Sequence, residues 1–194
     1  MRGHLDIPNR THLSVEGSCG GSSFGLTLAK NTLLDGGRVL WVSPEFPNEQ
    51  RFSQIFAEVD ITSSSKFHAV NLVGKLDQTV NSLIRLSNSL PNVQLIVLDD
   101  WCEKQGKIPS DSIQSIAKLA DGIPDNVKLL LITKLGTNVT GESEFIVRGE
   151  KQMKDSNFEI LCLNKSKNSS DRILSKEEQE TNLVIEDSGF KLKD

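Results

Sequence analysis

The sequence predicts an α/β protein with a mostly parallel central sheet flanked by helices and with antiparallel C-terminal strands. Three observations indicate this class. Short apolar runs, typical of strands buried on both faces, alternate with helical patterns up to about residue 132. A glycine-rich loop joins the first strand to the first helix. Beyond residue 157, short strands follow one another without helical patterns between them, as antiparallel strands allow.

The first part of the chain contains two strand–helix repeats. Residues 11–16 alternate as a strand does, and the helix after them carries apolar residues on one face until Asp35-Gly-Gly37 ends it. The run Arg38-Val-Leu-Trp-Val42 predicts a buried strand. Asn48 is expected to cap the following helix, because an asparagine side chain accepts from the free amides of a first turn.

The alternation continues through the middle of the chain. The expected elements are, in order, a loop over 62–65, a strand over 67–72, a helix over 76–90, a strand over 93–100, a helix capped by Ser110 and a strand over 127–132. The polar, glycine-containing stretch 134–149 predicts a mobile loop. Short strands are expected over 158–163, 172–174 and 183–185.

Length and composition favour one domain over residues 1–194, since a chain of this size buries one sizeable core. No apolar run approaches the roughly 20 residues that span a bilayer, and the N-terminus lacks an apolar signal core. We therefore expect a cytoplasmic or nuclear protein that is not secreted and has no membrane partner. The net charge of −4 provides no general attraction for nucleic acid, so any such binding needs a local basic patch.

The glycine-rich loop has the features of a phosphate-binding turn that has lost its charge. The residues concerned are Gly17, Gly20, Gly21, Ser22 and Ser23. A working loop reads G-x-x-x-x-G-K-[ST], in which the lysine reaches the outer phosphates and the hydroxyl binds Mg²⁺. With Gly17 first, Ser23 takes the lysine position and Phe24 the hydroxyl position; starting one residue earlier places Ser22 and Ser23 there. Neither alignment supplies a lysine.

Several local sequences, in their order along the chain, resemble the RecA/KaiC-like superfamily of ATPase cores. Gly36-Gly-Arg-Val-Leu-Trp-Val-Ser-Pro-Glu45 is similar to the second strand with its acidic residue, and Leu95-Ile-Val-Leu-Asp99-Asp100 to the Walker B strand. The ending Val184-Ile-Glu-Asp-Ser-Gly189-Phe190 is similar to that of archaeal RecA paralogues. The resemblance implies a single RecA-like domain, in which Glu45 polarises the attacking water and Asp99 holds Mg²⁺.

The missing lysine changes what this resemblance implies for activity. Phosphoryl transfer depends on positioning and charge stabilisation, so we do not expect hydrolysis by the isolated chain. ATP or ADP with Mg²⁺ is expected to bind weakly or not at all, through backbone amides at the helix start. Plain structural alternatives stay open: a glycine turn that binds nothing, Asp99 as part of a solvated turn, and Glu45 as an exposed carboxylate.

Three functional hypotheses follow from the resemblance. The first is a catalytically degenerate RecA-like protein that assists DNA recombination or repair, with a RecA-like ATPase or a second copy of itself as partner and single-stranded DNA as a further ligand. The second is a divergent KaiC-like ATPase completed by a cation from a neighbouring subunit. The third is a structural subunit of an Elongator-like ring that acts on RNA, a ligand we favour less. Basic residues of the last third, among them Lys134 and Lys165, are candidates for such contacts or form a solvated face.

Overall fold

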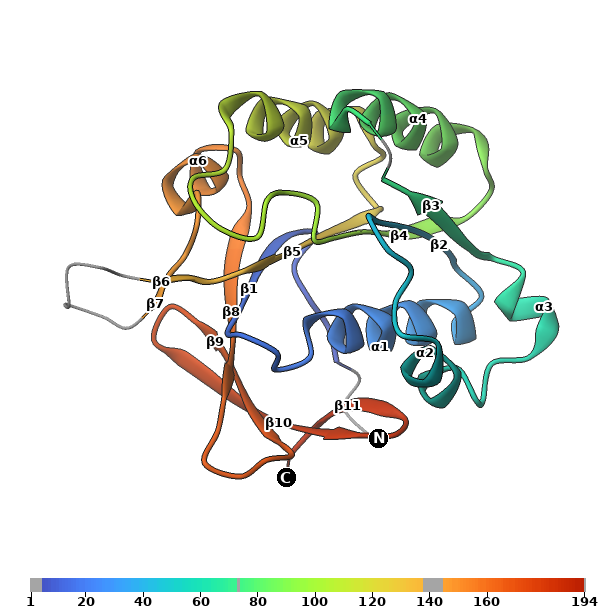
Figure 1. The fold of residues 1–194 in the computed structure, drawn as a ribbon. Helices are drawn as coiled ribbons and strands as arrows, with labels where there is room; N and C mark the ends of the chain where they lie inside the picture. The colour runs from blue at the N-terminus through green and yellow to red at the C-terminus, as the bar shows by residue number, and fades with distance from the viewer. Residues whose placement is uncertain (1–4, 73, 138–144, 194) are drawn as a thin grey trace.

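The computed structural model describes residues 5–72, 74–137 and 145–193, which form one nine-stranded sheet between two layers of helices (Figure 1). The strands are β1 (Arg10–Val15), β2 (Arg38–Ser43), β3 (Phe67–Asn71), β4 (Val93–Asp99), β5 (Lys128–Lys134), β6 (Gly136–Thr137), β7 (Phe145–Ile146), β8 (Glu159–Lys165), β9 (Asp171–Lys176), β10 (Gln179–Glu186) and β11 (Gly189–Leu192). The helices are α1 (Gly21–Leu34), α2 (Glu49–Ile55), α3 (Ile61–Ser64), α4 (Leu76–Ser89), α5 (Ser110–Gly122) and α6 (Glu150–Asp155).

The large sheet has the strand order β11-β10-β9-β8-β1-β5-β4-β2-β3. The strands from β8 to β3 in this order are parallel to their neighbours, and β9, β10 and β11 follow as antiparallel strands. This confirms the predicted fold class. The strand predicted over 158–163 differs in one respect: β8 pairs parallel with β1, and α6 lies in the crossover that leads to it.

The two faces of the sheet carry separate cores, because side chains of one strand point alternately to opposite sides. Leu13 and Val15 of β1 belong to the core under α1, whereas Leu40 and Val42 of β2 belong to the core under α4 and α5. Figure 1 shows α1 and α2 below the sheet and α4 and α5 above it. Covering both faces explains the continuous apolar runs of the central strands.

Local details differ from the predictions at three places. The loop predicted over 62–65 lies mostly within the short helix α3 (Ile61–Ser64), whose first turn is capped by the Asp60 carboxylate. The cap of α5 is Pro109 and not Ser110, which is the first helical residue. Within the predicted loop 134–149, β6 and β7 pair as a two-stranded hairpin, while residues 138–144 lie outside the described residues. The Asn48 cap is confirmed, since its side chain accepts from the Arg51 amide.

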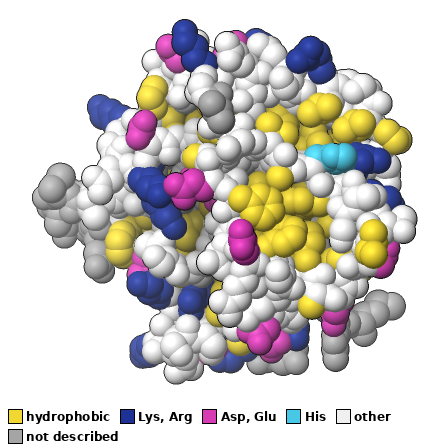
Figure 2. All heavy atoms as spheres, turned by 45° about the vertical axis from the view of Figure 1, so that its right-hand side comes forward, with side chains coloured by type: hydrophobic (Ala, Val, Ile, Leu, Met, Phe, Trp, Pro, Cys, Tyr) yellow, Lys and Arg dark blue, Asp and Glu magenta, His cyan; other side chains and the backbone are white. Residues whose placement is uncertain are grey.

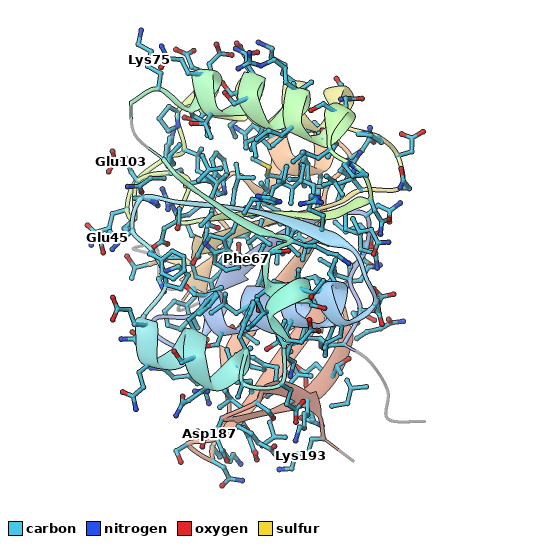
Figure 3. All side chains as sticks on the ribbon, turned by 90° about the vertical axis from the view of Figure 1, so that its right-hand side faces the viewer. Glu45, Phe67, Lys75, Glu103, Asp187 and Lys193 are labelled. Atoms are coloured by element: carbon cyan, nitrogen blue, oxygen red, sulfur yellow. The ribbon has the colours of Figure 1, made fainter. Side chains whose placement is uncertain are left out.

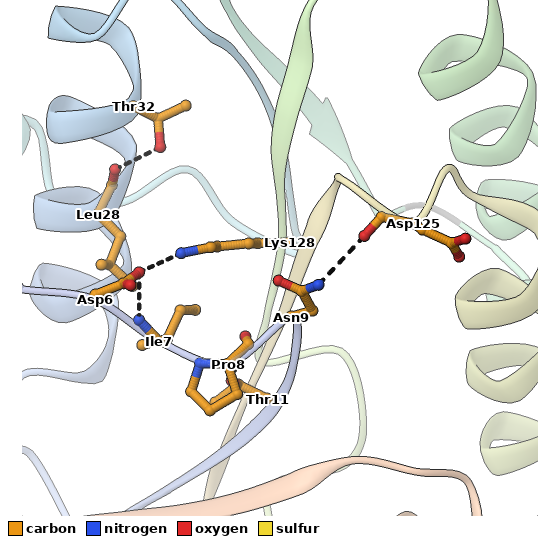
Figure 4. A network of polar contacts seen from close by, with 9 residues as sticks. All are labelled: Asp6, Ile7, Pro8, Asn9, Thr11, Leu28, Thr32, Asp125 and Lys128. Atoms are coloured by element: carbon orange, nitrogen blue, oxygen red, sulfur yellow. Dashed lines mark hydrogen bonds and ion pairs between the residues drawn. The ribbon is translucent and has the colours of Figure 1, made fainter.

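The segment before β1 is tied to the end of the sheet opposite the glycine loop (Figure 4). Asp6 forms an ion pair with Lys128 of β5 and accepts from the Ile7 amide, and the Asn9 amide donates to the Asp125 carbonyl. None of the helices in the described residues is long and apolar enough to cross a membrane.

The outer edge at β3 carries an aromatic cluster formed by Phe46, Phe52, Phe56 and Phe67. Phe52 and Phe56 stack with ring centroids 4.2 Å apart, and Phe46 is 52% exposed. Figure 2 shows hydrophobic side chains gathered on this side of the molecule, with acidic side chains along one border. The cluster covers the edge of the α1-side core and leaves part of its apolar surface in solvent.

Candidate functional site

The glycine loop, residues 16–20, connects β1 to α1 at the carboxyl edge of the parallel strands, where open α/β sheets place their ligands. Gly17 and Gly20 have φ angles of 47° and 103°, conformations that residues with a side chain adopt at a cost. Gly21 is required for another reason, because a Cβ there would lie 2.9 Å from a methyl group of Val15. The sequence therefore places these glycines where the turn and the close helix–strand packing need them.

The start of α1 presents free donors. Among the described residues, the amides of Gly21, Ser22 and Ser23 have no hydrogen-bond partner, and the helix has no side-chain cap. The Phe24 amide is the first amide of the helix that has a hydrogen-bond partner; it donates to the Gly20 carbonyl at 2.8 Å. A helix start of this kind favours an anion, but it does so equally in a structural turn.

Ser22 faces the end of the predicted Walker B strand. Its hydroxyl hydrogen-bonds to the carboxylate of Asp99, which is only 6% exposed at the end of β4. Burial raises the pKa of the Asp99 carboxyl to about 6, although the bond from Ser22 and the charge of Lys134 oppose this. The structure thus brings the loop and Asp99 together, as the resemblance implied, and leaves Asp99 partly protonated near neutral pH.

The Ser23 hydroxyl accepts a hydrogen bond from a residue that was not predicted from the sequence. Arg51 of α2 donates through Nε to the Ser23 hydroxyl at 3.0 Å. The same guanidinium donates to the carbonyls of Glu186 and Asp187 in the β10–β11 turn, at 2.7 and 3.1 Å. Arg51 therefore links α1, α2 and the C-terminal hairpin. No local pattern around residue 51 signals this, because its partners lie 28, 135 and 136 residues away.

Phe24 does not lie at the metal position to which the first alignment assigned it. Its side chain is fully buried in the α1-side core and packs edge-on against Phe190, with ring centroids 5.6 Å apart. The hydroxyl that faces Asp99 is that of Ser22, so Phe24 adds no bulk at the end of β4. Its aromatic ring instead anchors β11 to α1.

A cavity of about 730 Å³, here called the inner cavity, lies beside the end of β4. Its wall includes Ser22, Glu45, Asp99, Asp100, Glu103 and Lys104. Figure 3 shows Glu45 and Glu103 on the same edge of the molecule. The structure therefore brings Glu45 and Asp99 to one cavity, as the resemblance implied.

The charged side chains that line the inner cavity are mostly acidic. Four carboxyl groups face it, and the single lysine on its wall, Lys104, is mostly exposed and lies 3.9 Å from Asp100. The described residues contain no group of three or more His, Cys, Asp or Glu side chains arranged to hold a metal ion. A polyanion placed here would meet repulsion from these carboxylates, which Lys104 alone opposes among the described lining residues.

A second cavity, of about 890 Å³ and here called the outer cavity, lies on the other side of the loop. It is lined by Gly17, Ser18, the segment 104–108, residues 134–137 and residues 145–149. Lys134 at the end of β5 donates to the Gly17 carbonyl at 2.8 Å. Lys134 is among the basic residues of the last third that were candidates from the sequence, but its contact with the loop follows from the pairing of β5 with β1 in the folded protein.

Comparisons with known proteins agree with the fold. No protein-family model matches the chain, and no curated protein sequence matches it either. The RadB recombinase structure is 18% identical, with a TM-score of 0.66 over 95% of this chain and 91% of that one. Another structure, of a single ATPase domain, is 13% identical, with a TM-score of 0.70 over 96% and 85% of the two chains.

A DnaB-like replicative helicase, solved for its interactions with primase, is 12% identical with a TM-score of 0.68. This chain is covered over 96% of its length but spans only 57% of the helicase. At these identities the similarity shows the fold alone: a RecA-like α/β fold with a mostly parallel sheet and antiparallel C-terminal strands.

Proposed function

We propose that this chain is a catalytically degenerate RecA-like protein that acts as an accessory or assembly partner in DNA recombination or repair. One observation carries the proposal: the inner cavity keeps Glu45 and Asp99 but presents an acidic wall where a triphosphate would need a cation. Retention of the whole RecA-like framework around this cavity supports a role for the domain's surfaces and not for hydrolysis.

The similarity to the RadB recombinase supports the recombination context, because the match spans nearly the whole of both chains. A role on DNA also agrees with the cytoplasmic or nuclear location expected from the sequence. The partner in this proposal is a RecA-like ATPase or a second copy of the chain, and ATP or ADP with Mg²⁺ is not required for it.

Single-stranded DNA is the proposed nucleic acid ligand. The outer cavity offers four cationic side chains, contributed by Lys104, Lys107, Lys134 and Arg148, in a chain whose net charge is −4. A local basic surface of this kind is what an acidic protein needs to bind a phosphate backbone. RNA carries the same backbone charge, so it is an alternative ligand that a direct comparison must separate.

The test mixes the purified protein with a RecA-like ATPase from the same source and with single-stranded DNA, and follows complex formation by analytical ultracentrifugation. We expect a complex with the ATPase, with DNA or with both. A protein that stays monomeric and binds neither would refute the proposal. Parallel titrations with DNA and RNA, read as the dependence of affinity on salt, distinguish a DNA protein from a subunit of an Elongator-like RNA ring.

A second candidate function is a divergent KaiC-like ATPase completed in trans. The wall of the inner cavity favours it, because Glu45 and Asp99 both lie on a surface that a neighbouring subunit's lysine or arginine could approach. Phosphate release measured across protein concentrations decides between the two. Turnover that appears only when oligomers form supports the ATPase, and its absence at those concentrations removes it.

A further inference from the structure

The two strands that flank β1 both end in a lysine beside the glycine loop. In the parallel register, Val15 of β1 lies next to Lys134 of β5 on one side and next to Leu163 of β8 on the other, two residues before Lys165. The loop begins directly after Val15. The sheet therefore places the lysines Lys134 and Lys165 beside the glycine loop, which lacks a lysine of its own.

The ammonium groups lie close to Gly17. Nζ of Lys134 donates to the Gly17 carbonyl at 2.8 Å, and Nζ of Lys165 lies 3.7 Å from where a Cβ of Gly17 would be. The Glu16 carboxylate at the start of the loop accepts from the Lys165 backbone amide at 2.7 Å. Within the part of the chain that the structure describes, neither lysine forms an ion pair with a carboxylate. Each of these charges is thus available to an anion at the loop.

Among the described residues, the charged side chains that line the outer cavity are all cationic. They are Lys104, Lys107, Lys134 and Arg148, and the other described lining residues are uncharged. The inner cavity, separated from it by the loop, has the opposite charge. The amides of Gly17 and Ser18, which belong to the outer wall, have no partner among the described residues. An anion that approaches the loop from the outer side therefore meets free amides and, among the described charged lining residues, positive charge.

Arg148 is held rigidly at this wall. Its side chain is 5% exposed, and it donates through Nε to the Gly106 carbonyl at 2.8 Å and through Nη2 to the Gln105 carbonyl at 3.3 Å. Nη1 is buried without a hydrogen-bond partner in the described residues. A buried guanidinium left with an unused donor costs free energy unless an acceptor reaches it.

We propose that the outer cavity is a phosphate-binding site in which Lys134, from the strand next to the loop, supplies the cation that the glycine loop lacks. The phosphate would accept hydrogen bonds from Lys134 and from the amides of Gly17 and Ser18. The positive charges of Lys165 and Arg148 would add a longer-range attraction. The ligand class is a phosphate ester, from either a free nucleotide or a nucleic acid strand. The nucleic acid source of this phosphate rests on the proposed function, which assigns DNA to the same basic surface, whereas the site requires no second protein and so does not depend on the partner role.

The test measures binding by isothermal titration calorimetry at low salt with three probes: pyrophosphate, ADP without metal, and a short oligothymidylate. The variant is Lys134→Gln and the matched control is Lys118→Gln, which removes an exposed lysine of α5 paired with Asp77. We expect Lys134→Gln to weaken binding at least about tenfold, as loss of a charge-assisted hydrogen bond does, and Lys118→Gln to leave it nearly unchanged.

Two further variants keep the result interpretable. Lys134→Arg retains the charge and is expected to restore most of the affinity, which a merely structural loss would not allow. Asp99→Asn removes a negative charge from the inner cavity and is expected to change affinity much less than Lys134→Gln does. The proposal is overturned if no probe binds the wild-type protein, or if Lys134→Gln binds as tightly as the wild type does. It is also overturned if Asp99→Asn raises the affinity about tenfold, because the phosphate would then lie in the inner cavity.

The probes also identify the source of the phosphate. Pyrophosphate and ADP binding that depends on Lys134 supports a nucleotide ligand, whereas Lys134-dependent binding of oligothymidylate alone supports a strand. Either result leaves the partner role to be decided by the ultracentrifugation test, so failure of one proposal is distinguishable from failure of the other.

Discussion

The hydroxyl of Ser22 donates to the buried carboxylate of Asp99, joining the first turn of α1 to the end of β4. This contact places a hydroxyl and a carboxylate together, as a Mg²⁺-binding loop does, while the lysine of such a loop is absent. The inner cavity beside them is therefore acidic, and the cations of this region lie on the opposite side of the loop.

Replacing Asp99 with Asn is expected to change the pH dependence of stability. The folded-state pKa of about 6 exceeds the unfolded value of about 3.9, so the folded protein binds the extra proton and loses stability as pH rises between them. Relative to wild type, the free energy of unfolding of Asp99→Asn should rise by roughly 1–3 kcal/mol from about pH 4 to pH 7. Urea titrations at several pH values measure it, and a pH-independent difference would contradict the expectation.

His12 is expected to affect the pH dependence of stability in the opposite direction to Asp99. Burial, and then the charge of Arg148, lower its pKa from 6.5 to about 4, so the unfolded chain takes up a proton that the folded protein excludes. Its contribution is present above about pH 6.5 and is lost as pH falls towards 4, by up to roughly 3 kcal/mol. We expect His12→Gln to lose less stability than wild type on acidification. A parallel loss in both proteins would show that His12 does not titrate in this way.

Phe24→Thr is expected to destabilise the protein without creating activity, because Phe24 is a core residue and not a blocked metal ligand. Truncating a buried phenylalanine costs roughly 3–5 kcal/mol. Phe46→Thr, at a position that is 52% exposed, is the control and should cost much less. Thermal unfolding and phosphate release are measured together; a stable Phe24→Thr protein with new turnover would restore the alignment that places residue 24 at the metal.

Arg51→Ala is expected to loosen the C-terminal hairpin. The guanidinium donates to Ser23 and to the carbonyls of Glu186 and Asp187, and bonds to charged groups contribute about 1.5–3 kcal/mol where they are shielded from water. Because Arg51 is partly exposed, we expect a loss of about 1–2 kcal/mol and faster amide exchange in β10 and β11. Arg85→Ala on α4 is the control and should leave this exchange unchanged, because Arg85 is exposed, donates to the Ser82 hydroxyl at 3.4 Å and has no hydrogen bond to β10 or β11 within the described residues.

Gly189→Ala is expected to disturb the packing of β11 on α1. A Cβ at Gly189 would overlap the Thr27 hydroxyl, which accepts from the Phe190 amide, and its φ of +108° already disfavours a side chain. Gly106→Ala, with φ +77° and nothing within 4 Å of its Cβ, isolates the cost of backbone strain. We expect the first variant to lose about 1–3 kcal/mol more than the second. Equal losses in denaturant titrations would show that the contact with Thr27 is unimportant.

Much of the fold was predictable because local sequence patterns specify its strands, helices and turns. The apolar runs of β2, β4 and β5 show burial on both faces, and the glycines at 17 and 20 show a turn that needs positive φ angles. The loop, Asp99 and Glu45 were candidates through the resemblance, and the structure places Ser22 of the first helical turn, Asp99 and Glu45 on the wall of one cavity at the shared edge of the parallel strands. The strand at 158–163 was predicted, but not its parallel pairing, because the six-residue α6 has too short a pattern to recognise.

The sequence by itself determined the α/β class, the place of the glycine loop and the absence of its lysine. Only the tertiary structure decided which residue stands at each point of the site. Arg51, Phe190 and Lys134 reach the loop from elements roughly 30 to 170 residues away, and such contacts depend on strand order and helix packing, which no local pattern specifies. For the same physical reason, the separation of acidic and basic cavities by one loop became visible only in the folded protein.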